Sequence, residues 1–437
     1  MKGTARIALL LYIVWAWLPA VTPEAQVDIT VTRTVVQRIS IAVVGLRPLR
    51  LDSRGSNLAA QAYSVLRDDL EFSTVFEVLP PAFLPFEPRE IRLGEEKEIL
   101  PSLSRLKVEA LVAAELTQRG KDLILEGRVY NIARGTFLGG KRYFGDAKAL
   151  RTMVHRLADD VILWLTGERG VASTRIAYAT IQNGATELHL MDYDGHNSVL
   201  VTGNRSINLS PRFSPDGKRL AYTSYRDGNP DLYVLNLDTG RRRKVSAVRG
   251  LNISPAWSPD GRWLALSLST GGGTNLYLMS LNRDGKGLQR LTRGLGISVS
   301  PSFSPNGRQI VFTSDRGGSP QIYVMDVEGT NLRRLSFGGD YNASPRWSPR
   351  GDKIAYVSSR AGEGFQIYLM NPDGSGAQQM TTVGSNEDPA WSPDGRHIVF
   401  TSNRGGKKDL YIMHADGSEQ KRLTRNGFKN FAPDWSP

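Results

Sequence analysis

Histidine and cysteine supply much of the metal-binding and nucleophilic chemistry of proteins, and this 437-residue sequence contains little of either. It has no cysteine, which excludes disulfides, a thiol nucleophile and cysteine-ligated metal centres. Its five histidines are His155, His189, His196, His397 and His414. No two of them have the HxH or HExxH spacing of a metal site. This composition argues against catalytic metal chemistry, and we expect no metal ion and no cofactor.

One histidine has an acidic neighbour at helical spacing. His155 and Asp159 lie one turn apart in the segment 150–165, whose apolar residues recur at helical intervals. Such a pair could transfer a proton in catalysis, but exposed pairs at this spacing are far commoner. We interpret this one as a surface pair.

Aspartate also recurs within a repeated motif, Ser/Asp-Pro-x-aromatic-Ser-Pro-Asp/Asn-Gly. The aspartates lack the dense spacing of a calcium-binding loop, so we interpret the motif as a turn in which Pro presets φ and Gly takes a positive φ. Copies begin at Ser210, Ser254, Ser300, Ser344 and Asp388, and a partial copy begins at Ala432. Their second prolines are 44 residues apart, with one interval of 46, and a period of this length is typical of a β-propeller with one blade per repeat.

The repeat also predicts how the propeller closes. The partial last copy supplies only an innermost strand, while the segments 176–180 and 187–191 align with the later strands of a blade. We therefore expect residues 174–437 to form six blades, with the ring closed by pairing the two ends of the repeat region in one sheet.

The residues just before the first proline of each copy form a candidate docking site. In a propeller, the segment that enters each innermost strand lies beside the central channel, so these residues surround one opening of it. Most are small and polar, and Leu251 and Val299 add an apolar spot, as in a compact docking site. The predicted partner-binding residues are Asn208, Ser210, Leu251, Asn252, Ser254, Ser298, Val299, Ser300, Asn342, Ser344, Asn386, Asp388 and Asn430.

The segment before the repeats begins with an export signal. Lys2 and Arg6 precede an apolar run over 7–18 that is too short to span a bilayer, which indicates a signal peptide over residues 1–25. An uncleaved anchor is the alternative. Residues 26–170 then predict a small α/β domain, with strands near 38–44, 76–78, 110–116 and 122–131 and helices near 56–70 and 150–165. The segment 166–170 is the expected linker.

Residues 26–37 alternate apolar and polar side chains, as an extended strand does. They could form an edge strand of the α/β domain, or they could add to the sheet edge of a partner in another state. The predicted partner-binding residues of this strand are Val27, Asp28, Ile29, Thr30, Val31 and Thr32.

The net charge of +12 raises the question of nucleic-acid binding. The basic residues are scattered singly through loops, apart from the run 241–244, and the export signal argues against a nucleic-acid partner. We interpret the charge as a solvated basic surface.

These features together resemble the TolB family of periplasmic propeller proteins. The resemblance rests on the export signal, the small α/β domain, the stretches HRLADD (155–160), LTGERG (165–170) and TRIAY (174–178), and the repeats that follow. It implies a mature, non-enzymatic periplasmic protein of the Tol–Pal system. Its expected partners are the peptidoglycan-associated lipoprotein on the propeller, a TolA-like inner-membrane protein on the N-terminal segment and, in some cases, other outer-membrane proteins. The resemblance further implies a role in outer-membrane integrity and cell division, and use by bacteriocins for import.

Two other classes of protein carry similar repeats. A hydrolase related to prolyl oligopeptidase would need a GxSxG nucleophile motif, which the chain lacks. A ligand-binding propeller such as a lectin would have no need of the α/β domain, which favours the Tol–Pal interpretation; another periplasmic propeller scaffold stays open as the alternative.

Overall fold

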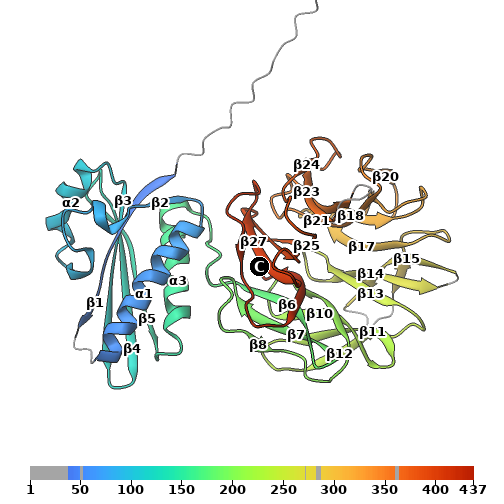
Figure 1. Ribbon diagram of the computed structural model, residues 1–437, viewed down its shortest axis with the longest axis horizontal. Helices are drawn as coiled ribbons and strands as arrows, with labels where there is room; N and C mark the ends of the chain where they lie inside the picture. The colour runs from blue at the N-terminus through green and yellow to red at the C-terminus, as the bar shows by residue number, and fades with distance from the viewer. Residues whose placement is uncertain (1–37, 50–52, 271, 282–286, 360–363) are drawn as a thin grey trace, which may run out of the picture. The chain divides into compact units, whose positions relative to one another are not determined.

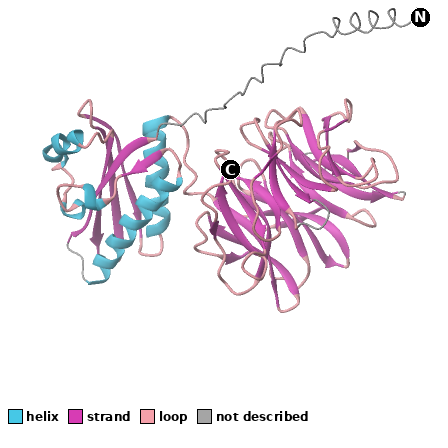
Figure 2. Ribbon diagram, turned by 45° about the horizontal axis from the view of Figure 1, so that its top comes forward, coloured by secondary structure: helices cyan, strands magenta, loops and turns pink. Residues whose placement is uncertain are grey.

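The computed structural model describes residues 38–49, 53–270, 272–281, 287–359 and 364–437. The predicted signal peptide and the predicted strand Val27–Thr32 lie outside the described residues. Within them, the chain forms an α/β domain followed by a six-bladed β-propeller, as expected (Figure 1). The α-helices belong to the first domain, and the propeller is drawn as strands and loops (Figure 2). No helix in the described ranges is long and apolar enough to cross a membrane.

The α/β domain is a five-stranded sheet with helices on both faces. The strand order is β2-β1-β3-β4-β5, with β2 and β3 parallel to β1 and with β4 antiparallel to both β3 and β5. The strands are β1 (Ile39–Leu49), β2 (Phe76–Val78), β3 (Ala110–Arg119), β4 (Asp122–Asn131) and β5 (Thr136–Gly145). The helices are α1 (Ser53–Phe72), α2 (Glu96–Arg105) and α3 (Leu150–Thr166), with short 3-10 turns at Pro81–Phe83 and Pro88–Glu90.

Two apolar layers position these helices. Helices α1 and α3 pack on one face of the sheet over Val43, Val112 and Leu125, while α2 packs on the other face over Ala42 and Leu111. Helix α3 approaches β4 closely because Gly127 has no side chain: a Cβ there would lie 2.2 Å from Leu157 Cδ1. The face of α3 turned away from the sheet packs against α1 and the propeller.

Each blade of the propeller is a four-stranded antiparallel sheet. From the innermost to the outermost strand, the first two blades are β9 (Asn208–Phe213), β10 (Arg219–Asp227), β11 (Asn229–Asn236) and β12 (Arg242–Ser246), and then β13 (Asn252–Trp257), β14 (Trp263–Thr270), β15 (Gly273–Ser280) and β16 (Leu288–Arg290). The next two are β17 (Ser298–Phe303), β18 (Gln309–Ser314), β19 (Gln321–Asp326) and β20 (Arg333–Arg334), and then β21 (Tyr341–Trp347), β22 (Ile354–Ser359), β23 (Gln366–Met370) and β24 (Gln378–Gln379). The last two are β25 (Asn386–Trp391), β26 (His397–Ser402), β27 (Asp409–His414) and β28 (Lys421–Arg422), and then β29 (Lys429–Trp435), β6 (Arg175–Gln182), β7 (Ala185–Asp192) and β8 (Val199–Leu200).

The last of these sheets, which we call the closing blade, confirms the predicted ring closure. Strand β29 pairs antiparallel with β6, and Trp435 lies opposite Ile176. The Trp435 indole donates a hydrogen bond to Thr174 Oγ1 at 2.7 Å, and the Ser436 amide donates to the Arg175 carbonyl at 2.8 Å. The two ends of the repeat region therefore share one sheet.

The repeated Ser-Pro-Asp-Gly segment forms the predicted turn between the first and second strands. In the β13–β14 turn, Ser258 Oγ donates to Asp260 Oδ1 at 2.6 Å and accepts the Trp263 amide at 3.0 Å, while Gly261 has a φ of 68°. Hydrogen bonds from Ser258 and from the Arg262 amide lower the pKa of Asp260 to about 2. Asp260 is thus held within the turn by its hydrogen bonds.

Candidate functional site

The predicted docking residues lie at the end of the propeller where the innermost strands begin, but six of them are buried. The side chains of Asn208, Asn252, Ser298, Asn342, Asn386 and Asn430 are almost completely shielded from solvent. Asn252 Nδ2 donates to the carbonyls of Pro230 and Val248 at 3.0 and 2.6 Å, and its Oδ1 accepts a hydrogen bond from Ser246 at 2.6 Å. These side chains fix the blade connections from inside, so in this structure they are not presented to a partner.

The residues immediately before the prolines have a second structural role. Each has a φ between 50° and 55°, in the left-handed region, at the point where the register of the innermost strand shifts: Ser210, Ser254, Ser300, Ser344, Asp388 and Ala432. Their side chains are half-buried, as are those of Leu251 and Val299. The predicted apolar spot is therefore only partly accessible.

Other apolar side chains at this end are much more exposed, and the repeat pattern did not single them out. Leu295 is 81% exposed and Phe337 76% exposed, and Ile297 and Val383 are also exposed. They lie in three consecutive blade connections, which lead into β17, β21 and β25. We call these four residues the apolar arc. Their flanking glycines, as in Gly294-Leu295-Gly296, are the sequence signal that could have identified them, because apolar residues in such polar loops rarely serve a core.

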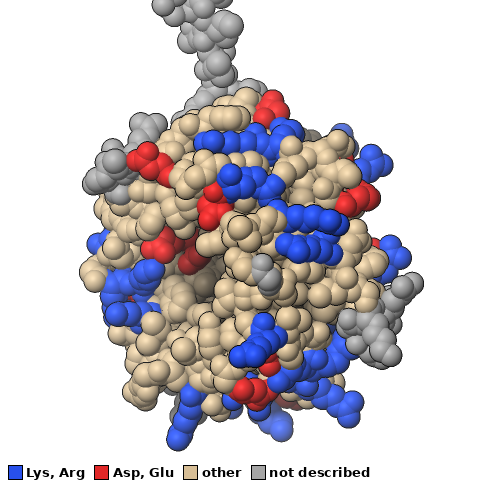
Figure 3. All heavy atoms as spheres, turned by 90° about the vertical axis from the view of Figure 1, so that its right-hand side faces the viewer, with Lys and Arg blue, Asp and Glu red and all other residues tan. Residues whose placement is uncertain are grey.

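The other three blade connections at the same end are basic. Arg205, Arg249 and Arg425 are exposed in the connections that lead into β9, β13 and β29. The opening of the channel is thus bordered by exposed apolar side chains and by arginines, and the two kinds are interspersed: Arg293 is exposed in the connection into β17, and Ile207 is 44% exposed in the connection into β9. Figure 3 shows one face of the molecule, with a central hollow that has both acidic and basic side chains around it.

A cavity of about 410 Å³ lies at the opposite end, where the Ser-Pro turns meet the channel. Its lining includes Arg212, Arg346 and Asp434. Burial raises the pKa of Asp434 to about 6, although the nearby Arg212 and the Phe213 amide, which donates to Asp434 Oδ2 at 2.8 Å, act in the other direction. Asp434 on β29 thereby joins the last innermost strand to the first.

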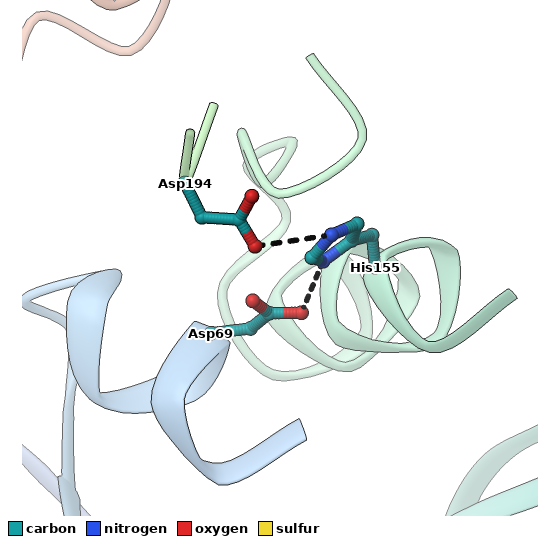
Figure 4. Close-up of side chains that lie close together, drawn as sticks. All are labelled: Asp69, His155 and Asp194. Carbon is teal, nitrogen blue, oxygen red and sulfur yellow. Dashed lines mark hydrogen bonds and ion pairs between the residues drawn. The ribbon is translucent and has the colours of Figure 1, made fainter. Parts of the chain in front are cut away.

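The expectation that His155 belongs to a surface pair is wrong. His155 is only 2% exposed, and it lies between two carboxylates (Figure 4). Its Nδ1 is 2.7 Å from Oδ2 of Asp69 on α1, and its Nε2 is 3.4 Å from Oδ2 of Asp194 in the turn after β7. Spacing along one helix could not show this, because the two partners are 86 residues before and 39 residues after His155 in the chain.

Further groups complete this cluster at the junction between the α/β domain and the closing blade. The Tyr193 hydroxyl donates to Asp69 Oδ1 at 2.5 Å, and Arg151 Nε donates to Asp194 Oδ2 at 3.0 Å. Burial alone would lower the pKa of His155, but the hydrogen bond and charge of Asp69 and the charge of Asp194 outweigh it, so the net pKa lies above the usual value. The cluster therefore favours an imidazolium between two carboxylates.

The same three residues are the only metal-ligand combination found within the described ranges. A metal ion could bind only one nitrogen of the ring, yet Asp69 and Asp194 contact opposite nitrogens. The geometry therefore suits a proton better than a metal ion.

Asp159, the expected partner of His155, instead holds the linker. Its carboxylate accepts the amides of Ala172 and Ser173 at 2.8 and 2.9 Å. Beside them, Glu168 pairs with Arg396 of the neighbouring blade at 2.7 Å. These contacts fix the chain just before it enters β6.

Comparisons with known proteins agree with this architecture. A family model described as "TolB beta propeller domain" matches residues 163–437, and one described as "TolB amino-terminal domain" matches residues 27–138. The "Tol-Pal system protein TolB" of Geobacter sulfurreducens is 44% identical over 211 residues, 48% of either chain, and that of Syntrophotalea carbinolica is 40% identical over 201 residues, 46% of either chain. The chain thus spans about half the length of the curated relatives it matches. A crystal structure of TolB from Acinetobacter baumannii aligns with a TM-score of 0.77 at 28% identity, covering 92% of this chain and 97% of that one.

Proposed function

This chain belongs to the TolB family, and on that premise we propose that it is a non-enzymatic component of the Tol–Pal system in the periplasm. In this proposal, the propeller binds the peptidoglycan-associated lipoprotein, and the segment Val27–Thr32 binds a TolA-like inner-membrane protein. The complex would link the layers of the envelope, support outer-membrane integrity and constriction during division, and offer bacteriocins a route of entry.

The observation that carries the propeller half of the proposal is the apolar arc beside the arginines. Exposed side chains such as Leu295 and Phe337 gain little by packing within this chain, whereas a partner that covered them would remove large apolar areas from water. Arg205, Arg249 and Arg425 favour a partner surface with acidic side chains next to its apolar centre. The docking surface that we propose therefore lies outward of the buried asparagines.

Calorimetric titration with the soluble domain of the lipoprotein tests this surface. Phe337→Glu should weaken binding by roughly 30-fold or more, the loss typical of a central contact. Phe144→Glu is the matched control, because Phe144 is 72% exposed on β5 in the α/β domain, and it should leave the affinity unchanged. Unchanged affinity of Phe337→Glu, with the fold retained, would move the site elsewhere.

The N-terminal half needs a separate measurement. Deletion of residues 26–33 should abolish binding to the C-terminal domain of the TolA-like protein while leaving binding of the lipoprotein nearly intact. If the deletion lowers the unfolding midpoint and leaves that binding unchanged, the segment is an edge strand of its own domain.

A further inference from the structure

The cluster at the domain junction has a property that partner binding does not require. Asp69 and His155 come from α1 and α3 of the α/β domain, whereas Tyr193 and Asp194 come from the closing blade. The ion pair of His155 with Asp194 and the hydrogen bond of Tyr193 with Asp69 therefore both cross the junction. The ion pair depends on the proton of His155, whereas the Tyr193 hydroxyl donates its own proton to Asp69.

We propose that Asp69, His155 and Asp194 form a proton-dependent clasp that holds the α/β domain on the closing blade and opens when His155 loses its proton. A neutral imidazole has a single N–H group, and Asp69 Oδ2 lies close enough to Nδ1 to retain it. The lone pair of Nε2 then faces Asp194 Oδ2 at 3.4 Å, where two acceptors repel each other. Deprotonation thus turns an attraction across the junction into a repulsion.

The charged groups around His155 agree with attraction across the junction when His155 is protonated and repulsion when it is neutral. The charged groups around His155 are Asp68 and Asp69 on α1, Arg151 and Asp159 on α3, and Asp194 with His196 beside it on the closing blade. Burial raises the pKa of Tyr193 well above its ordinary value, so its hydroxyl keeps its proton. On the sheet side of α3, Tyr143 and Lys141 pair with Asp160 instead.

The neighbouring blade contributes two histidines and several charged residues, which are Asp394, Arg396, Glu419, Lys421, Arg422 and Arg425. Phe72 of α1 stacks on His397 with ring centroids 3.9 Å apart, and His414 lies behind His397 at 5.3 Å. Burial lowers the pKa of His397 to about 4 and lowers that of His414 as well. Both histidines are uncharged in the range where His155 titrates, so they do not add to the change in charge at the clasp.

The direction of the pH dependence follows from the raised pKa of His155. Its contribution to the junction is complete below the unfolded value of about 6.5 and is lost as the pH rises through the higher folded value. We therefore expect the two domains to be held at pH 6 and released at pH 9.

Spin labels can measure the separation of the two domains directly, because the chain contains no cysteine of its own. Lys121→Cys places a label in the exposed β3–β4 turn, and Lys218→Cys places one in the exposed β9–β10 turn. The distance distribution between the labels should be narrow at pH 6 and should widen by about a factor of two or more at pH 9. A width that is the same at both pH values would overturn the proposal.

Two variants in the labelled protein separate the clasp from a general effect of pH. Asp194→Asn, at a partly exposed turn position, should give the wide distribution already at pH 6. His196→Gln is the matched control, because His196 is an exposed titratable group in the same turn, and it should behave as the parent does. A narrow distribution for folded Asp194→Asn at pH 6 would show that contacts such as Phe72 with His397 hold the junction without the clasp.

Discussion

Closure of the ring by β29 leads to a prediction at Trp435. Its indole is buried in the core shared by the closing blade and the α/β domain, and it donates to Thr174 Oγ1. Trp435→Ala should cost about 3–5 kcal/mol for the lost burial and the cavity, and about 1 kcal/mol for the hydrogen bond. The melting midpoint should therefore fall by roughly 10 °C.

Loss of stability alone would not show that Trp435 closes the ring, so hydrogen exchange is the decisive assay. Trp347 occupies the equivalent position on β21, is also buried, and serves as the matched control. Both alanine variants should be less stable, but only Trp435→Ala should accelerate exchange selectively in β6, the strand that β29 covers. Selective acceleration should reach about two to three orders of magnitude if most of the lost free energy appears as opening of this strand. Unchanged exchange in β6, or equal acceleration in Trp347→Ala, would refute the reasoning.

Two further predictions concern buried polar groups. The pKa of Asp434 is raised to about 6, so folding disfavours its charged form, and the free energy of unfolding falls as the pH rises from about 4 to about 6. Asp434→Asn keeps an acceptor for the Phe213 amide. At pH 7 its free energy of unfolding should exceed that of the parent by up to about 3 kcal/mol, and at pH 4 the two proteins should be equally stable. Asn252→Ala leaves the Ser246 hydroxyl, the Val248 amide and three carbonyls without their partner and should cost about 2–4 kcal/mol in denaturant unfolding, while binding of the lipoprotein by the folded fraction stays unchanged. An equal loss in Leu251→Ala, a half-buried neighbour, would argue against a specific role for Asn252.

The propeller could be predicted from the sequence because its information is periodic. A spacing of 44 residues specifies the blade, and the offset between the two ends of the repeat region specifies which strands pair in the closing blade. The turn residues act locally, so Gly261 has the positive φ that the motif implies.

Two elements of the α/β domain were not predicted, for physical reasons. Strand β5 carries a Gly-Gly pair and mostly exposed side chains, so it lacks the alternation that marks a strand with one buried face. Helix α2 contains Pro101 and is only 10 residues long. Strand β5 is held by its pairing with β4, and α2 is held by its packing on the sheet.

The docking site stays a prediction, and the sequence did not show which side chains at the channel opening are accessible. The motif locates Asn252 and Ser254 at the channel opening, but not the direction in which a side chain points once the register shifts at Ser254. The exposure of Leu295 and Phe337 depends on loops that are not part of the repeat. The environment of His155 depends on residues from three separate elements, which no local spacing reveals.

The closing blade joins two of these observations. The linker after α3 is short: α3 ends at Thr166, and β6 begins at Arg175. The α/β domain can therefore reach little of the propeller beyond the closing blade and the blade before it, which are the sheets that supply Tyr193, Asp194 and His397. Strand β7, which leads into Tyr193, pairs with β6, and β6 pairs with the closing strand β29. Ring closure and the contact between the domains thus depend on the same sheet, so a change that loosens β29 should also weaken the junction, whereas the same change in a distant blade should not.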